Sequence, residues 1–221
     1  MAAATTLALA PAAAQAATVE TDRTCYLQQD ATTVAVRGSE FAAGAPFTVK
    51  LDDVALAGGD SVIGADGSMS GSFAPPRLAS STFQRRFKLS LETATEAPFT
   101  HFTVTRLLAT YAPNRGSVAS TRVRFSLFGF GLGGPAAQAY VHYVSPRGKA
   151  VKTVALGRPT GQCGAIPRTA KRKLFPFSRV CTGTWRLQFD TRRKYTRGTT
   201  RSTFLYYTLR VPVSGTKRVS C

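Results

Sequence analysis

The sequence predicts an all-β fold made of two tandem antiparallel β-sandwich domains. Three observations support this prediction. Short runs of alternating apolar and polar residues recur along the chain, and no window beyond the alanine-rich N-terminus has apolar residues at helical spacing over several turns. Gly, Pro, Asn and Asp separate these runs, as they do in sandwiches. A short motif also occurs twice, which indicates two similar units.

The repeated motif has the pattern F-x-x-G-x-P, and its two copies lie 89 residues apart. That distance exceeds the roughly 20–50 residues of solenoid repeats and matches a sandwich domain of roughly 100 residues. We therefore expect one domain over residues 18–108 and a second over 121–221, joined by a linker over 109–120 (ATYAPNRGSVAS) that is rich in Pro, Gly and Ser. The residues of the motif are Phe41, Gly44 and Pro46 in the first copy and Phe130, Gly133 and Pro135 in the second.

Nine segments are expected to form strands because they combine alternation with β-branched or aromatic residues. In TWRLQFD, for example, Trp185, Leu187 and Phe189 alternate with polar residues, so one face packs on a core and the other meets water. The nine segments are 32–37, 47–51, 83–91, 99–107, 121–128, 139–144, 151–156, 184–190 and 203–211.

Two turns are expected from local chemistry. Asp66-Gly67, which precedes Met69–Phe73, predicts a hairpin with a type I′ turn, because that turn needs positive φ at both central positions. Ser145-Pro146-Arg147-Gly148 predicts a type I turn, with proline at its second position and glycine at its fourth.

The N-terminus predicts export. Residues 1–17 contain a small, apolar run that ends in Ala14-Gln15-Ala16, an A-x-A cleavage pattern typical of a secretory signal peptide. No Lys or Arg precedes the run, so the start of this signal peptide is expected to lie upstream. An alanine-rich tail is the alternative. The run is too short to span a bilayer, and no second apolar run follows, so no transmembrane anchor is expected after cleavage.

Four cysteines agree with an oxidising compartment. Cys163 and Cys181 lie on either side of a basic segment and are the preferred disulfide pair. Their bond would hold a long connection between strands. Cys25 and Cys221 then either pair with each other or remain thiols. No C-x-x-C spacing occurs, so we expect no metal site.

Charge divides the chain into two unlike halves. Residues 18–106 carry eight Lys or Arg against ten Asp or Glu, a net charge of −2. Residues 107–221 carry the other 21 basic residues against one acid, Asp190, a net charge of +20. A domain with a field of one sign attracts polyanions, and salt weakens the attraction. The alternative is a solvated surface whose charge only maintains solubility.

The densest basic positions lie on two expected loops and are the candidate binding residues for anionic envelope polymers or other polyanions. No motif for sequence-specific recognition of nucleic acid accompanies them. These candidates are Arg168, Lys171, Arg172, Lys173, Arg192, Arg193, Lys194 and Arg197.

Enzyme chemistry has weaker support. A glycosidase site needs two carboxylates, and the second half has only Asp190. His142 lies in an alternating strand, and no G-x-S-x-G or Walker pattern occurs. We therefore expect no catalytic residue and no cofactor. An envelope-modifying hydrolase that uses His142 with Asp190 stays as an alternative.

Two stretches carry a family resemblance. The G-x-x-F-x-x-G turn of Gly38, Phe41 and Gly44, within VRGSEFAAGAP, resembles the Ig-like repeats, including IPT/TIG-type modules, of proteins secreted by high-GC Gram-positive bacteria. The second copy departs from this pattern because Leu127 stands where the first glycine would be. The second half, with GFGLGG, GQCG and GTWRLQFD, is similar to a C-terminal module of secreted actinobacterial proteins. The resemblance implies exported Ig-like sandwiches and implies no catalytic residues.

These observations together predict an exported, non-enzymatic binding or structural module of the cell envelope, with a cationic C-terminal domain that captures polyanions. A protein-binding module that uses an exposed strand edge is a further alternative, and its binding would be insensitive to salt. The sequence leaves the oligomeric state open.

Overall fold

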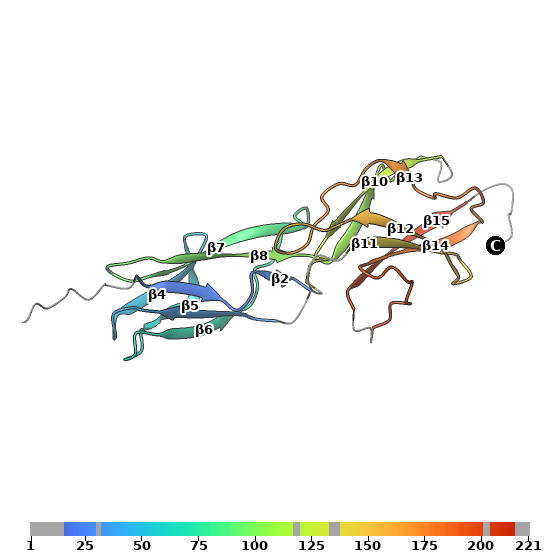
Figure 1. The fold of residues 1–221 in the computed structure, drawn as a ribbon. Helices are drawn as coiled ribbons and strands as arrows, with labels where there is room; N and C mark the ends of the chain where they lie inside the picture. Colours follow the sequence, from blue (N-terminus) through green and yellow to red (C-terminus); the bar gives the residue numbers. More distant parts are fainter. Residues whose placement is uncertain (1–15, 30–31, 117–119, 133–137, 201–203, 215–221) are drawn as a thin grey trace, which may run out of the picture. The chain divides into compact units, whose positions relative to one another are not determined.

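The computed structural model describes residues 16–29, 32–116, 120–132, 138–200 and 204–214, and in these ranges all regular structure is β (Figure 1). The prediction of an all-β fold built from antiparallel sheets is confirmed. One strand pair, β2 with β8, is parallel. The strands are β1 (Thr18–Thr21), β2 (Cys25–Leu27), β3 (Val34–Ser39), β4 (Pro46–Leu51), β5 (Val54–Val62), β6 (Met69–Phe73), β7 (Gln84–Glu92), β8 (Phe99–Thr105), β9 (Leu108–Ala112), β10 (Arg122–Phe128), β11 (Ala139–Val144), β12 (Ala150–Gly157), β13 (Arg172–Lys173), β14 (Gly183–Asp190) and β15 (Tyr206–Val213).

All nine strands predicted from alternation are present, as β3, β4, β7, β8, β10, β11, β12, β14 and β15. Three of the others lack the signal on which the prediction depends. β2 and β13 are too short to show a period, and β5 (VALAGGDSV) is exposed along most of its length and contains two glycines.

The chain forms two compact units whose bounds differ from the predicted domains. The first contains residues up to Asp22 with Ala35–Ser72 and Lys88–Thr100, and the second contains Arg23–Val34, Phe73–Phe87 and the chain from His101 on. Parts of the predicted N-terminal domain therefore belong to the same unit as the C-terminal half. The predicted linker over 109–120 is wrong in its first residues, because β9 pairs with β10 from Leu108↔Phe128 to Ala112↔Arg124. The predicted signal peptide lies almost entirely outside the described residues.

In the first unit, the buried residues of β3 and β4 occupy alternate positions. β1 pairs with β3, and β4 pairs with β5 and β7. Phe41 is buried after β3, and a Cβ added to Gly38 would lie 2.8 Å from its ring. The glycine of the G-x-x-F motif is therefore needed to admit the aromatic ring. Phe130 of the second motif is buried as well, while Gly133 and Pro135 lie outside the described residues.

The predicted hairpin at Asp66-Gly67 is wrong. β5 and β6 belong to different sheets, so this segment connects two sheets instead of two neighbouring strands. Gly67 has a φ of 71°, Asp66 has no positive φ, and the Gly67 amide donates to the Gly64 carbonyl at 3.0 Å. The Asp66 carboxylate accepts hydrogen bonds from the hydroxyl and the amide of Ser68, and these bonds lower the pKa of Asp66.

In the second unit, two sheets face each other across one core. One sheet has the order β12-β11-β14-β15 and the other β13-β10-β9. Val123, Phe125 and Leu127 of β10 pack with Val141 and Trp185 of the opposite sheet in a single buried cluster. The predicted turn at Ser145-Pro146-Arg147-Gly148 is confirmed in the β11–β12 hairpin, where the amide of the fourth residue donates to the carbonyl of the first at 2.8 Å.

Two glycine-rich segments meet in this unit. The Phe130 amide donates to the Gly164 carbonyl, and the Gly131 amide donates to the Cys163 carbonyl, both at 3.0 Å. A Cβ on Gly164 would lie 2.0 Å from the Gly131 nitrogen, and the φ of Gly164 is 66°. This close approach is open only to glycine, and it fixes the position of Cys163.

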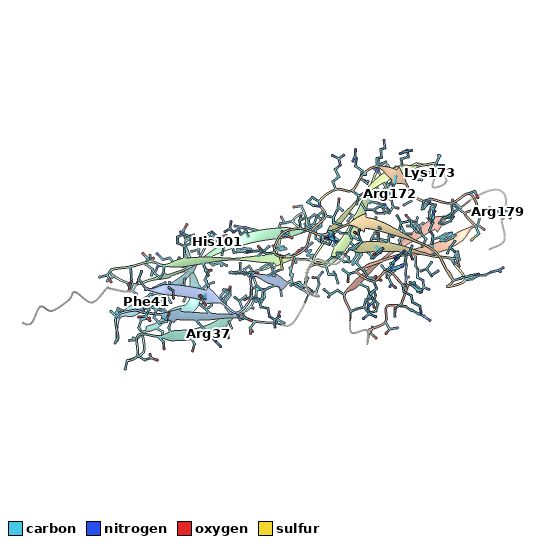
Figure 2. The ribbon with its side chains drawn as sticks, in the orientation of Figure 1. Arg37, Phe41, His101, Arg172, Lys173 and Arg179 are labelled. Atoms are coloured by element: carbon cyan, nitrogen blue, oxygen red, sulfur yellow. A yellow bond between two sulfur atoms is a disulfide. The ribbon has the colours of Figure 1, made fainter. Side chains whose placement is uncertain are left out.

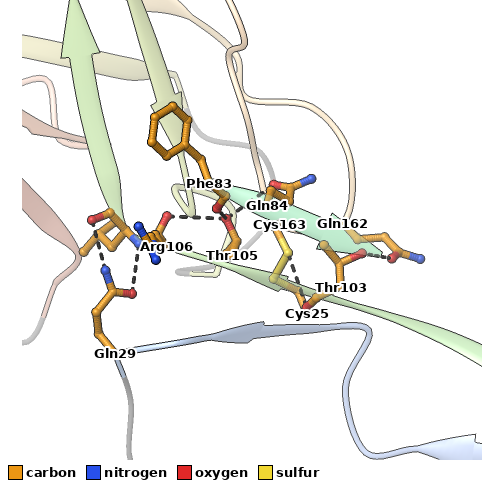
Figure 3. The surroundings of a disulfide bond; sticks show 10 residues. Cys25, Gln29, Phe83, Gln84, Thr103, Thr105, Arg106, Gln162 and Cys163 are labelled. Atoms are coloured by element: carbon orange, nitrogen blue, oxygen red, sulfur yellow. Dashed lines mark hydrogen bonds between the residues drawn. A yellow bond between two sulfur atoms is a disulfide. The ribbon is translucent and has the colours of Figure 1, made fainter. Parts of the chain in front are cut away.

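The disulfide joins Cys25 to Cys163, not Cys163 to Cys181 (Figure 3). Cys163 lies next to β8, where its Sγ is 3.8 Å from the Thr103 carbonyl oxygen. Cys181 faces elsewhere: it packs in the sandwich core, and its carbonyl accepts a hydrogen bond from the Trp185 indole. Cys163 and Cys181, which lie on either side of the basic segment, therefore have different surroundings.

The predicted alternatives for Cys25, a bond to Cys221 or a thiol, are also wrong. Cys181 is itself disulfide-bonded, to neither Cys25 nor Cys163, and Cys221 lies outside the described residues.

Candidate functional site

Three of the eight predicted binding residues surround one hollow of about 450 Å³ in the second unit. Arg168 is exposed and does not line the hollow, and the four basic residues of 192–197 lie on another loop. Figure 2 marks Arg172 and Lys173 on β13. The lining residues are Arg122, Lys171, Arg172, Lys173, Pro176, Phe177 and Ser178, so no acidic residue lines the hollow.

Strand pairing brings the cations together. β13 pairs with β10 so that Lys173 lies directly opposite Arg122 and Arg172 opposite Val123. Like charges directly opposite each other destabilise a sheet, and an anion between them offsets that cost. Arg122 also donates to the Lys171 carbonyl at 3.4 Å. The prediction missed Arg122, because nothing in the sequence indicates that a two-residue strand pairs with β10.

Arg172 is the most constrained of these cations. It is half-buried, and its Nη1 donates to the Ala155 carbonyl of β12 at 2.9 Å. Its Nε has no hydrogen-bond partner among the described residues, and the same is true of the hydroxyl of Tyr143. Burial raises the pKa of Tyr143, and the nearby Arg172 charge lowers it to a smaller extent. The phenol therefore stays neutral and does not compensate the arginine charge.

We predict that Tyr143→Phe reduces the loss of stability at alkaline pH. Above the ordinary tyrosine pKa of about 10, the unfolded chain ionises while folded Tyr143 stays protonated. The free energy of unfolding of the wild type then falls as pH rises, by up to about 1.4 kcal/mol per pH unit from this residue. Urea unfolding at a series of alkaline pH values measures the slope, and equal slopes for the two proteins would contradict the prediction.

Phe177 lines the hollow but is held by other aromatic rings. Its ring centroid lies 5.7 Å from that of Tyr143, 5.6 Å from that of Phe175 and 5.3 Å from that of Trp185. Lys152 fixes the same loop by donating to the Pro176 carbonyl at 2.8 Å. The wall of the hollow is therefore an extension of the core.

The other predicted cations lie on the loop that follows β14. Arg192, Arg193, Lys194 and Arg197 are all exposed, and the guanidinium of Arg192 lies 4.1 Å from the ring centroid of Phe204. Gln188 holds this loop: its side-chain nitrogen donates to the Thr196 carbonyl at 2.7 Å, and its side-chain oxygen accepts from the Gly198 amide at 3.0 Å.

His142 and Asp190, the residues of the hydrolase alternative, do lie together. His142 Nε2 is 3.1 Å from Asp190 Oδ1, and its Nδ1 is 2.8 Å from the Thr153 hydroxyl. A hydroxyl, an imidazole and a carboxylate in this order form the catalytic group of many hydrolases.

Both side chains are fully buried, however, with 0% exposed. The Asp190 carboxylate also accepts hydrogen bonds from the Arg192 amide at 2.8 Å and from the Gln188 side chain at 2.7 Å. These hydrogen bonds satisfy the buried polar atoms of His142 and Asp190, and they hold the 191–200 loop against β14.

The described residues contain no group of three or more His, Cys, Asp or Glu placed to hold a metal ion. In the same part of the chain, no helix has the length and apolar character that crossing a membrane requires.

No protein-family model matches the chain, and no curated protein matches it. One solved structure that is similar is described as the "crystal structure of tetra-tandem repeat in extending region of large adhesion protein". The similarity covers 90% of this chain and 49% of that one, at 14% identity and a TM-score of 0.29. This chain thus spans about half the length of that structure.

Proposed function

We propose that this protein is an exported, non-enzymatic module of the cell envelope that captures polyanions through the hollow between β10, β13 and residues 176–178. The observation that carries the proposal is the convergence of Arg122, Lys171, Arg172 and Lys173 on one hollow that no acidic residue lines. Asp190, the one acid after residue 107, is buried in a hydrogen-bond network on β14 and does not line it. Anionic polymers therefore meet an uncompensated positive field there.

Export and envelope location are part of the same proposal. The N-terminal apolar run with its A-x-A pattern supports them. A disulfide between residues 138 positions apart is also typical of an oxidising compartment.

We predict that the variant Lys171→Gln/Arg172→Gln/Lys173→Gln, the hollow variant, binds polyphosphate or heparin at least about tenfold more weakly than the wild type at low salt. Each lost contact also reduces the magnitude of the negative slope of log K against log salt by about 0.7–0.9, so three lost contacts reduce it by about 2–3. Binding measured by fluorescence anisotropy over a salt series gives both numbers.

The matched control is Arg192→Gln/Arg193→Gln/Lys194→Gln, the loop variant, which removes the same charge from exposed positions of the other basic loop. The loop variant should keep most of the affinity for the polymer, because removing these three charges weakens only the long-range electrostatic attraction. Equal losses in the two variants would mean that net charge alone drives binding. An affinity that does not change with salt concentration would instead favour the alternative of a protein-binding module that uses an exposed strand edge.

The hydrolase alternative has a separate test. If an activity on envelope polymers is detected, His142→Ala should abolish it under that alternative, and an unchanged rate would remove the alternative.

A further inference from the structure

We propose that the hollow selects phosphate or sulfate groups of a polymer over carboxylates, and that it binds these groups without stacking against the organic part of the polymer. This inference rests on the proposed function and names the ligand class of the same site.

The contacts of Arg172 restrict the edges that its guanidinium can offer to a ligand. An arginine recognises a planar carboxylate best with two parallel N–H groups. Here Nη1 is committed to the Ala155 carbonyl, and Nε is enclosed in the protein. The fork that Nε forms with an Nη is therefore closed to a ligand, and in the proposed site Nη2 contacts the anion as a single donor.

Two segments of the chain supply the positive charges of the hollow. Lys171 and Lys173 are exposed and flank Arg172 in sequence, while Arg122 belongs to the paired strand β10. Lysine ammonium groups act as point charges with rotatable donors, and they bind phosphate in this manner. Donors that converge from several directions suit the oxygens of a tetrahedral anion better than the two coplanar oxygens of a carboxylate.

Phe177 forms the aromatic wall of the hollow. Stacking on a base requires an aromatic face that is free to receive it. The ring of Phe177 already packs against Tyr143, Phe175 and Trp185, at interplanar angles of 88°, 74° and 38°. The core therefore holds the ring in place, and in the proposed site the wall shapes the hollow and does not stack on bases.

The experiment compares polymers of matched length and charge at low salt: polyphosphate, a sulfated heparin fragment, poly-glutamate and single-stranded DNA. The wild type should bind polyphosphate about tenfold more tightly than poly-glutamate, and the hollow variant should lose this difference together with most of the affinity. Heparin binding equal to that of polyphosphate assigns the site to tetrahedral anions in general, and weaker heparin binding assigns it to phosphate. DNA that binds much more tightly than polyphosphate would overturn the absence of stacking.

Failure of the proposed selectivity and failure of the proposed function give different results. If the wild type binds poly-glutamate as tightly as polyphosphate and the hollow variant loses both, the function stands and the selectivity is wrong. If the hollow variant keeps its affinity for both polymers, the site itself is wrong.

Arg172→Lys tests the single-contact geometry. Because lysine also supplies one point charge, this variant should stay within about threefold of the wild type, whereas a bidentate arginine would not tolerate the change. A loss as large as that of Arg172→Gln would contradict the geometry. The variant also removes the bond to Ala155, so thermal unfolding accompanies each measurement. The variant Lys171→Gln/Lys173→Gln changes only exposed side chains. It therefore measures separately how much the two lysine charges contribute to the affinity.

Discussion

Replacing both Cys25 and Cys163 with alanine should lower the free energy of unfolding by about 3–5 kcal/mol. The disulfide spans 138 residues, so it removes a large part of the freedom of the unfolded chain. It also joins β2 to the Gly161–Gly164 turn, two segments of the second unit that are far apart in the sequence. Urea unfolding of the oxidised wild type and the double variant measures the difference.

A neighbouring substitution provides the control for this prediction. Gln162→Ala removes the hydrogen bond from the Thr103 hydroxyl, which is 3.2 Å long, and leaves the disulfide in place. It should cost about 1 kcal/mol or less. If the double cysteine variant loses no more than this control, the disulfide does not stabilise the fold as we infer.

Asp190→Ala should destabilise the protein by about 3–5 kcal/mol, the second large effect. Asp190 is fully buried and accepts hydrogen bonds from the Arg192 amide and the Gln188 side chain, with His142 Nε2 also at bonding distance. Alanine leaves these groups without an acceptor in the protein interior, where an unpaired polar group is costly. Because Gln188 also holds Thr196 and Gly198, the 191–200 loop should loosen as well.

Thermal and urea unfolding measure the stability, and amide hydrogen exchange over 191–200 measures the loop. Asp53→Ala is the control, since Asp53 is an exposed acid paired with Lys88 at 2.9 Å and should cost about 1 kcal/mol or less. A wild-type-like Asp190→Ala protein would mean that the buried network contributes little. Exchange that stays slow in the loop would mean that other contacts hold it.

The sequence predicts the strands well where alternation is strong. β11 matches its predicted bounds, 139–144: one face of AYVHYV packs in the core, and on the other face His142 lies next to the ring of Tyr195. β13 has two residues and no period, so only its pairing with β10 defines it. The turn at Ser145 was predictable because it depends on four consecutive residues, whereas the turn at Asp66 depends on which sheet receives β6.

The remaining errors of the sequence prediction concern contacts between residues that are far apart in the sequence. The pairing of Cys163 depends on the contact between Gly131 and Gly164, which no local pattern indicates. Four of the five unit boundaries fall inside strands, in β3, β6, β7 and β8, where composition does not change. For the candidate site, charge density indicated three of the four cations that line the hollow. The sequence could not separate Lys171–Lys173 from the residues of the 191–200 loop, because strand pairing and burial decide which of them surround a hollow.

The most direct test of the central claim is an NMR titration of the protein with polyphosphate at low salt, followed through backbone amide chemical shifts. Binding in the hollow predicts the largest shifts at Arg122, Lys171, Arg172, Lys173, Phe177 and Ser178, with smaller and later shifts over 192–197. Largest shifts over 192–197, or small shifts spread evenly over the basic surface, would contradict a defined site and leave only a diffuse attraction.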